Sequence, residues 1–531
     1  MRKTFIFTIA LMFVSINLFP QQLTIDWATT AGGGMPDFGE GVTVDDAGNA
    51  YITGNFRDEM TLLGETFDPE SDKNTMFLAK VDPEMDLQWS VTGEADGMTG
   101  SMGFKTAYHD GHVYLYGDFR GEATFSSTDF TETTMNAETR AMFVAKYTDD
   151  GVLDWIKKME SSHVAGLIPI GSANNLAVDE DGAVYVTTNF RDDIEIDGTL
   201  VDPEGSGGSN YHGILVKFDA LGAYQWHWNT THEGDDRGEA VTVTPDGHVL
   251  FAIRYNEEIT VNDVNYANEG GGIAIIELEA DGTYVWDHQL YTDDTNDANL
   301  WDMRFCANNN LYVVGESNTT LTWDDDNIWE PVNTSKSSAF VLQIDDDTNI
   351  SWAEFFGDDD ENTSAKTVRI GDEGVYVAGE HIGTMVLNDD ITVTSNDGST
   401  DIFYALIDPV DGTFKDAGAF GGTGNEYFGD MDLSPEGEAY FMGRYLGTFE
   451  AAGESFPSEG SFDFFVTRYT TVDELLPPAD PLDITNLMNK TGEDLPDEIG
   501  SGGNARGAAI YMDRFALNVK SIVITPKKEN M

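Results

Sequence analysis

The chain has 531 residues, of which 95 are Asp or Glu and only 28 are Lys or Arg, giving a formal net charge of −67. A surface this negative repels nucleic acid and anionic lipid, so both are excluded as partners, whereas saline or calcium-rich surroundings suit it. A hydrophobic content of 40% is ample for a large core, and the single cysteine, Cys306, excludes an intrachain disulfide.

The N-terminus has the pattern of an export signal. Arg2 and Lys3 precede a short apolar run from Phe5 to Phe19, and the polar pair Gln21-Gln22 follows. A charged start and a short apolar run favour a secretory signal over a membrane span, so residues 1–22 are predicted to be a signal peptide. No later stretch is apolar enough to cross a bilayer. The mature chain is therefore expected outside the cell or at its surface.

Four short strand-like runs come next, at Gly41–Asp45, Ala50–Phe56, Met76–Val81 and Leu87–Val91. The sequences Asp-Ala-Gly-Asn and Asp-Pro-Glu-Met separate two pairs of them, where tight turns are expected. The unit recurs down the chain, and its marker residues stand roughly 60 to 70 residues apart. These markers are Trp27, Trp89, Trp155, Trp226, Trp286, Trp352 and Phe414. Four strands per unit at such a period are typical of one propeller blade per repeat.

Two stretches carry a family resemblance. TTAGGGMPDFGEGVTVDDAGNAYITGNF (Thr29–Phe56) and GAFGGTGNEYFGDMDLSPEGEAYFMGRY (Gly418–Tyr445) resemble the SBBP-type β-propeller repeat of bacterial secreted proteins. The resemblance extends from about Trp27 to Tyr469 and implies a propeller fold. It implies no activity, because the family is a repeat architecture without a shared reaction.

The last repeat and the start of the chain complement each other. The seventh unit ends at Phe464–Thr470 and no tryptophan strand follows it, whereas Leu23–Thr30 is a tryptophan strand without the rest of a blade. We therefore predict an all-β fold, a seven-bladed propeller of four-stranded antiparallel blades over residues 23–472, closed by the N-terminal strand completing the last blade. Residues 473–531 are predicted to be a linker and tail, with attachment or secretion as one role.

One repeat position changes from unit to unit. The residue after the second-strand glycine is polar and varied, and propellers bind ligands through such strand ends and loops. We predict a ligand-binding face at this position, with ordinary solvated strand ends as the alternative. Its members are Asn55, Asp118, Asn189, Arg254, Glu316, Glu380 and Arg444.

A second repeat position is mostly basic. Lys80, Lys146, Lys217 and Arg468 share one place in the third strand. This regularity favours pairing with carboxylates of the same or the adjacent blade over an anion-binding ring. Acidic clusters suggest calcium as the one conceivable cofactor, since Ca²⁺ takes about six to eight oxygen ligands. The candidates are Asp324, Asp326, Asp358 and Asp360, although no spaced calcium loop is present.

Catalytic motifs are missing from the sequence. It contains no H-E-x-x-H, no G-x-S-x-G and no phosphate loop. A pair of carboxylates at glycosidase spacing stays open, because that separation is spatial. The sequence thus favours an exported, monomeric, non-catalytic binding or scaffold module for a glycan or an envelope protein. The alternatives are an extracellular polysaccharide hydrolase or lyase and a structural module of a larger surface assembly.

Overall fold

The computed structural model describes residues 23–471, except for 70–71, 162–173, 202–209, 232–233, 269, 293–297, 307–308, 325, 331–334 and 397. The predicted signal peptide, 1–22, and the predicted linker and tail, 473–531, lie outside the described residues. Within the described part every regular element is a β-strand and the strands pair antiparallel. The predicted all-β class is therefore confirmed. No described helix is long and apolar enough to span a membrane.

The same four-stranded antiparallel order recurs along the chain. From the inner to the outer strand the sets are β2 (Phe38–Val44), β3 (Ala50–Phe56), β6 (Thr75–Val81), β7 (Leu87–Ala95); β8 (Ser101–His109), β9 (His112–Ser126), β10 (Glu132–Thr148), β11 (Leu153–Ser161); β12 (Leu176–Val178), β13 (Val184–Phe190), β16 (His212–Phe218), β17 (Tyr224–Asn229); β18 (Arg237–Val243), β19 (Val249–Tyr255), β22 (Gly272–Leu278), β23 (Tyr284–Thr292); β24 (Ala298–Phe305), β25 (Leu311–Ser317), β28 (Ser338–Ile344), β29 (Ile350–Phe356); β30 (Thr363–Gly371), β31 (Gly374–His381), β34 (Asp401–Ile407), β35 (Phe414–Phe420); and β36 (Thr423–Leu433), β37 (Ala439–Ala451), β39 (Asp463–Thr471), β1 (Leu23–Ala31).

Short strands extend these sheets or form separate hairpins. They are β4 (Met60–Leu62), β5 (Glu65–Phe67), β14 (Ile194–Ile196), β15 (Thr199–Val201), β20 (Glu258–Val261), β21 (Val264–Ala267), β26 (Leu321–Trp323), β27 (Asp326–Trp329), β32 (Thr384–Val386), β33 (Thr392–Thr394) and β38 (Glu454–Pro457).

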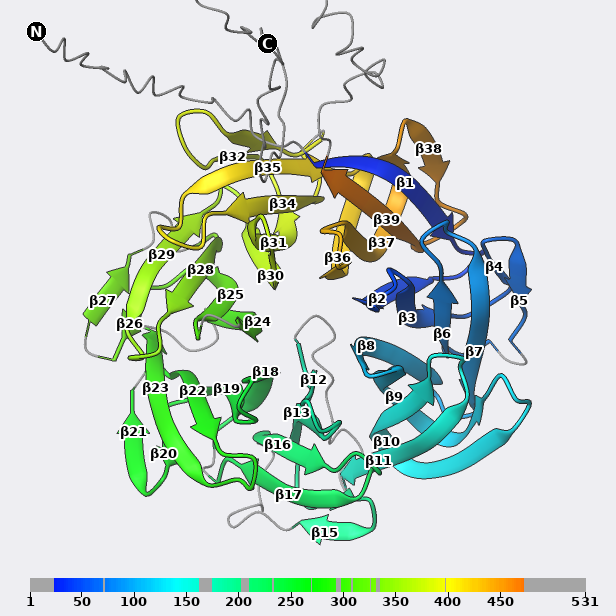
Figure 1. The fold of residues 1–531 in the computed structure, drawn as a ribbon, viewed down its shortest axis with the longest axis horizontal. Helices are drawn as coiled ribbons and strands as arrows, with labels where there is room; N and C mark the ends of the chain where they lie inside the picture. The colour runs from blue at the N-terminus through cyan, green and yellow to red at the C-terminus, as the bar shows by residue number, and fades with distance from the viewer. Residues whose placement is uncertain are drawn as a thin grey trace, which may run out of the picture. The chain divides into compact units, whose positions relative to one another are not determined.

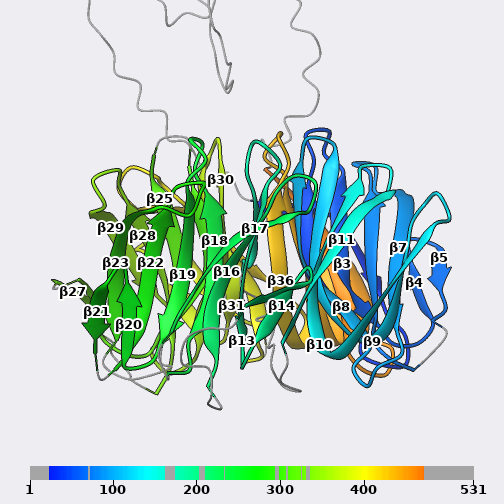
Figure 2. The ribbon, with the colours of Figure 1, turned by 90° about the horizontal axis from the view of Figure 1, so that it is seen from below.

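The four-stranded sets stand around a central axis like the blades of a propeller (Figure 1). The strands run roughly along this axis and their connections gather at its two ends (Figure 2). We name these ends by what they carry. The turn face carries the tight turns between the first and second strand and between the third and fourth strand of each set. The strand-end face is the opposite end, where the second strands finish.

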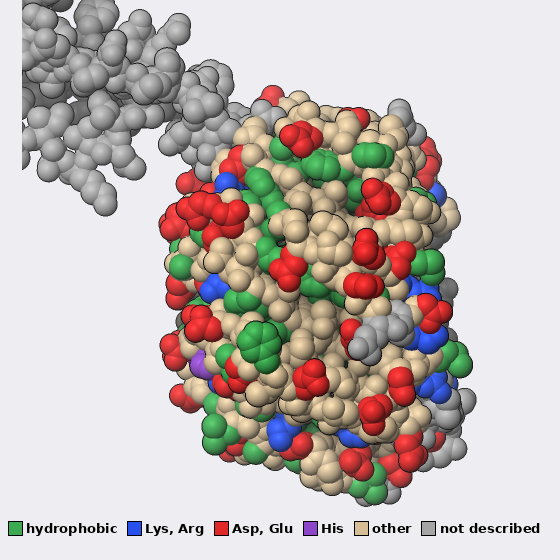
Figure 3. Space-filling view, turned by 90° about the vertical axis from the view of Figure 1, so that its right-hand side faces the viewer, with side chains coloured by type: hydrophobic (Ala, Val, Ile, Leu, Met, Phe, Trp, Pro, Cys, Tyr) green, Lys and Arg blue, Asp and Glu red, His purple; other side chains and the backbone are tan. Residues whose placement is uncertain are grey.

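Burial explains why the second and third strands are so apolar. All seven residues of β3, β13 and β34 are buried, because neighbouring sheets cover both faces of these strands. Burying a Val, Leu, Ile or Phe side chain contributes about 1.5–3 kcal/mol. Acidic side chains are instead spread over the outside, where Lys and Arg are few (Figure 3). The apolar core thus lies between the sheets, and acidic side chains cover the outside.

The N-terminal strand lies where the sequence places it. β1 pairs antiparallel with β39, with Trp27 opposite Arg468 and Thr30 opposite Phe465. The Arg468 guanidinium binds the Asp26 carboxylate at 2.7 Å and donates a hydrogen bond to the Pro83 carbonyl at 2.6 Å. Because Pro83 belongs to the β6–β7 turn, the second contact joins this sheet to the sheet that contains β6 and β7.

Candidate functional site

The structure places the seven predicted face residues at equivalent positions of the second strands. They stand next to last in β3, β13, β19, β25 and β31, and inside the longer strands β9 and β37. Asn55, Asp118 and Asn189 are buried there. Arg254, Glu316, Glu380 and Arg444 are only partly buried and lie on sheets that follow one another in the chain; we call these four the strand-end arc. The predicted set is therefore divided into a buried part and a partly open, charged part.

The buried members are packed differently from one another. Asp118 pairs with Arg140, and burial raises the pKa of Asp118 to about 6 although the guanidinium lowers it. The side-chain amides of Asn55 and Asn189 have no hydrogen-bond partner among the described residues. These three side chains lie inside the boundaries between sheets rather than at an open face.

Within the arc, each charged group is held by a neighbour. The Arg254 guanidinium binds Glu239 at 2.9 Å, and the Arg444 guanidinium binds Glu40 at 2.8 Å. Glu380 accepts a hydrogen bond from the Phe428 N–H at 2.9 Å. Burial raises the pKa of Glu239 and of Glu380, and the negative charge of Glu316 adds to both shifts. The arc therefore forms one connected electrostatic system across several sheets.

Aromatic rings accompany the arc. The Arg444 guanidinium lies 4.7 Å from the Phe38 ring centre and 5.4 Å from the Tyr427 ring centre. Phe462 contacts both rings, with centroid distances of 6.0 and 5.7 Å. All three rings are partly exposed. Guanidinium, carboxylate and aromatic groups together form a surface that can stack on and hydrogen-bond a polar ligand.

A β-bulge recurs at the same place in six inner strands, where it leaves one residue unpaired. Bulges re-aim side chains, and here they introduce Glu40, Phe104, Glu239, Trp301, Lys366 and Gly429. The Lys366 ammonium lies 3.5 Å from the Trp301 ring centre. The sequence analysis missed these residues, because a bulge is a change of pairing that single-strand patterns do not reveal.

Three of the residues predicted as calcium ligands take part in local hydrogen bonds. Asp324 accepts a hydrogen bond from His288 at 2.7 Å, and Asp358 accepts the Thr384 N–H at 2.7 Å. Asp360 donates its own N–H to Asp358, and Asp326 lies in β27 with its side chain outside the description. Across the described residues, no group of three or more His, Cys, Asp or Glu could hold a metal ion. Calcium binding stays a prediction.

One carboxyl pair lies together in the interior. Asp401 and Glu426 interact with each other electrostatically and are both fully buried. Burial, followed by the negative charge of Asp401, raises the pKa of Glu426 to about 9, and burial raises the pKa of Asp401 to about 6. A substrate has no path to side chains with no exposed surface, so this pair is structural.

On the turn face, a tryptophan and a third-strand side chain of one sheet pack closely against a turn of the next sheet, and this contact recurs. Trp226 and Lys217 both donate hydrogen bonds to the Ala280 carbonyl of the next sheet, at 3.1 and 2.7 Å. The turn glycine Gly282 has a φ of +87°, and a Cβ on it would lie 3.3 Å from the Trp226 ring. We call this contact, formed by Lys217, Trp226, Ala280 and Gly282, the Trp226 boundary.

Other boundaries repeat the arrangement. Trp89, Trp155 and Trp352 donate to the carbonyls of Asp149, Ala220 and Pro409, respectively. The basic residues of the third strand were predicted to pair with carboxylates, and Lys80 does lie 3.7 Å from Asp45. Arg468 likewise binds Asp26. Lys80, Lys217 and Arg468 also donate to a turn carbonyl of the neighbouring sheet, as does Gln343 at the same repeat position, whereas the Lys146 ammonium lies 5.4 Å from the Tyr114 ring centre.

The next boundary along the chain is open. Glu277 stands where Lys217 stands one sheet earlier, and Thr348, at a φ of +64°, stands where Gly282 would be. A carboxylate cannot donate to the turn carbonyl, and Glu277 instead binds His248. Among the described residues, the Trp286 indole N–H has no hydrogen-bond partner. We call this contact, formed by Glu277, Trp286 and the turn Asp345–Thr348, the Trp286 boundary.

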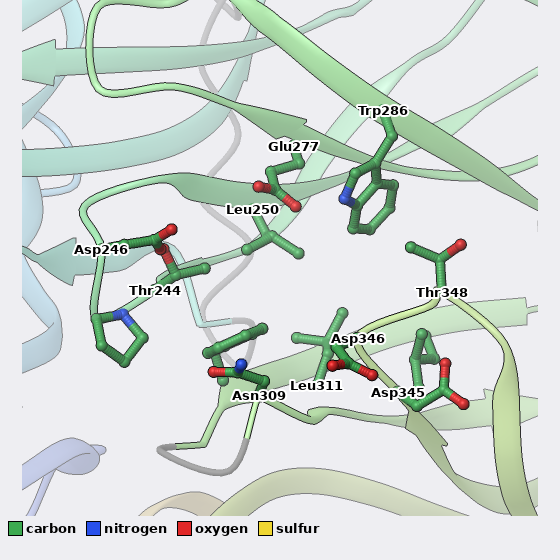
Figure 4. Close-up of a pocket in the computed structure, with 13 residues that line it drawn as sticks. Thr244, Asp246, Leu250, Glu277, Trp286, Asn309, Leu311, Asp345, Asp346 and Thr348 are labelled. Atoms are coloured by element: carbon green, nitrogen blue, oxygen red, sulfur yellow. The ribbon is translucent and has the colours of Figure 1, made fainter.

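A cavity of about 370 Å³ lies at the Trp286 boundary (Figure 4). The nitrogen edge of the Trp286 indole faces the side from which Glu277 and Leu250 project. The described residues that line the cavity are Thr244, Pro245, Asp246, Leu250, Glu277, Trp286, Phe305, Asn309, Leu311, Ile344, Asp345, Asp346 and Thr348. Sequence reasoning missed this site. The sequence feature that could have indicated it is the joint presence of Glu277 at the basic third-strand position and Thr348 at the turn-glycine position.

Comparison with known proteins identifies no family for this chain. No family model and no curated protein matches the chain. Among solved structures, a quinohemoprotein alcohol dehydrogenase from Pseudomonas putida is similar over 86% of this chain and 77% of its own, with 10% identity and a TM-score of 0.38. Virginiamycin B lyase from Staphylococcus aureus covers 66% of this chain and 96% of its own, with 9% identity and a TM-score of 0.30.

Proposed function

We propose that this chain is an exported, non-catalytic SBBP-type propeller that acts as a binding module outside the cell or at its surface. In this proposal seven blades form a closed ring and the chain works as a monomer. The repeated four-strand order supports the blade number, and the pairing of β1 with β39 supports closure. The ligand is a glycan or an envelope protein bound at the strand-end face.

The observation that carries the binding role is the grouping of the strand-end arc with partly exposed aromatic rings. Arg444 lies against Phe38 and Tyr427, and its side chain is 30% exposed although its guanidinium binds Glu40. Sugar rings and peptide side chains stack on such rings, and a guanidinium grips carboxylate or sulfate groups bidentately. A structural pairing alone does not require aromatic rings to stay partly exposed beside it.

A polysaccharide and envelope-protein array tests the binding role. The purified chain should be retained on at least one member without releasing oligosaccharide, and Arg444→Ala and Tyr427→Ala should each weaken retention about tenfold or more. Lys217→Ala, at the turn face, is the matched control and should bind normally. Release of oligosaccharide would support the hydrolase or lyase alternative instead, and unchanged retention in both variants would remove the strand-end face from the site.

Closure has its own test. Removing residues 23–30 takes away the strand that pairs with β39 and the Trp27 side chain, which packs against the core cluster that includes Met85. We expect the melting temperature to fall by on the order of ten degrees or more, because an open sheet edge and a lost boundary expose apolar surface. A melt equal to that of the full chain would show that β1 does not close the ring.

A further inference from the structure

We propose that the cavity at the Trp286 boundary binds a small organic cation, a protonated amine carried on a compact apolar body. The cavity lies on the turn face. Leu250 and Leu311 begin the strands β19 and β25 there, whereas Arg254 and Glu316 of the strand-end arc lie toward the opposite ends of the same strands. This site is therefore separate from the strand-end face, and the proposal of an amine site does not depend on the proposal of a binding site there.

Charge selects a cation. Four carboxylates line the cavity, and the thirteen described lining residues include no Lys or Arg. Glu277 retains only 13% side-chain exposure, whereas Asp246 and Asp346 are exposed at the rim. A carboxylate in a partly desolvated site interacts strongly with an ammonium group, and the strongly negative chain raises the local concentration of cations. His248 binds Glu277 and balances part of its charge, but four carboxylates against one imidazole leave the surroundings of the cavity negative, so an anionic ligand would be repelled.

The remaining walls select an apolar body of limited size. Trp286 offers an aromatic face, which attracts cations, and an indole N–H without a partner among the described residues. The side chains of Leu250, Phe305, Leu311 and Ile344 supply an apolar wall. The volume of about 370 Å³ lies within the range of roughly 300–1,000 Å³ typical of small-molecule sites.

Two features show that the cavity is more than loose packing. Thr348 keeps a left-handed backbone conformation that disfavours β-branched residues, where Gly151, Gly222, Gly282 and Gly412 occupy the equivalent turns and the unbranched Met85 occupies a further one. Glu277 meanwhile gives up the hydrogen bond that Lys217 makes to the turn carbonyl. The two changes act together, since either the lysine or a close approach of the indole would fill the space. A bare metal ion fits less well, because the described residues hold no three-ligand group.

The experiment compares three probes of nearly equal shape by isothermal titration: benzylamine, benzyl alcohol and benzoate, each at millimolar concentration, with calcium chloride as a fourth. Benzylamine should bind the full chain and the other probes should not. Glu277→Gln, which keeps the shape and removes the charge, should weaken benzylamine binding roughly tenfold or more. Absence of benzylamine binding, or equal binding of benzyl alcohol, would overturn the proposal, and displacement of benzylamine by calcium would indicate a metal site instead.

A repair variant separates the cavity from the rest of the surface. Glu277→Lys combined with Thr348→Gly restores the pattern of the Trp226 boundary, so it should abolish benzylamine binding while the melting temperature stays equal or rises. Asp281→Asn, an exposed turn carboxylate beside Gly282, is the matched control and should bind benzylamine like the parent chain. Binding retained in the repair variant would place the amine elsewhere and overturn the proposal. Should the repair variant not fold, Glu277→Gln alone decides.

Discussion

The Trp226 and Trp286 boundaries are equivalent contacts in successive repeat units. The first is closely packed, whereas the second contains a cavity. At the first, an indole and a lysine converge on one carbonyl and lie against a glycine turn. At the second, a glutamate and a threonine occupy the lysine and glycine places, and a cavity remains. The strand order is the same at both boundaries, so the difference between them lies in the side chains that occupy these places.

The largest difference is expected when the two tryptophans are truncated. Trp226→Ala should cost about 2–4 kcal/mol of unfolding free energy, because it removes a packed ring and leaves the Ala280 carbonyl with one donor fewer. Trp286→Ala should cost about half as much, since one side of that ring already faces a cavity. Urea unfolding of both variants beside the parent measures this. Equal losses would mean that the Trp286 ring is packed as tightly as its neighbour.

Exchanging the turn residues should have a smaller, reciprocal effect. Gly282→Thr forces a β-branched residue to a φ near +87° and crowds Trp226, so we expect a loss of about 1–2 kcal/mol. Thr348→Gly relieves the same strain and should gain roughly 1 kcal/mol. Thermal melts of both single variants and of the double variant show whether each substitution lowers or raises the stability. A stabilising Gly282→Thr would contradict the assigned role of the turn glycine.

Some features of these boundaries could be predicted from the sequence and others could not. The tryptophan period and the orphan strand at Leu23–Thr30 predicted the sheets and the pairing of β1 with β39, because both follow from apolar patterning. The division of the strand-end set could not be predicted, since burial of Asn55 but exposure of Arg444 depends on the neighbouring sheet. The alignment of the third strands shows that Glu277 replaces a basic residue. The consequence of this change could not be predicted, because the sequence does not show that the equivalent lysine donates to a carbonyl some 60 residues away.

The smallest effect concerns pH, and it distinguishes the two boundaries because only the Trp286 boundary holds a histidine–glutamate pair, His248 with Glu277. The hydrogen bond that the His248 imidazole donates to Glu277, together with the nearby carboxylates, raises the pKa of His248 above its ordinary value. The folded state therefore binds this proton more tightly than the unfolded state. The pair's stabilisation is complete below the ordinary histidine pKa and is lost as pH rises through the raised value.

Other buried groups act in the same direction, so the pair must be measured as a difference. Burial raises the pKa of Asp37 and of Asp236 to about 7, and these carboxyls also favour the folded state at lower pH. We expect His248→Asn to lose about 1 kcal/mol or less near pH 5 and to match the parent near pH 9. Glu277→Gln should reproduce that convergence, whereas Lys217→Gln, at the Trp226 boundary, should differ from the parent equally at both pH values. A constant gap between His248→Asn and the parent from pH 5 to 9 would show that the imidazole stabilises this boundary by packing rather than by its charge.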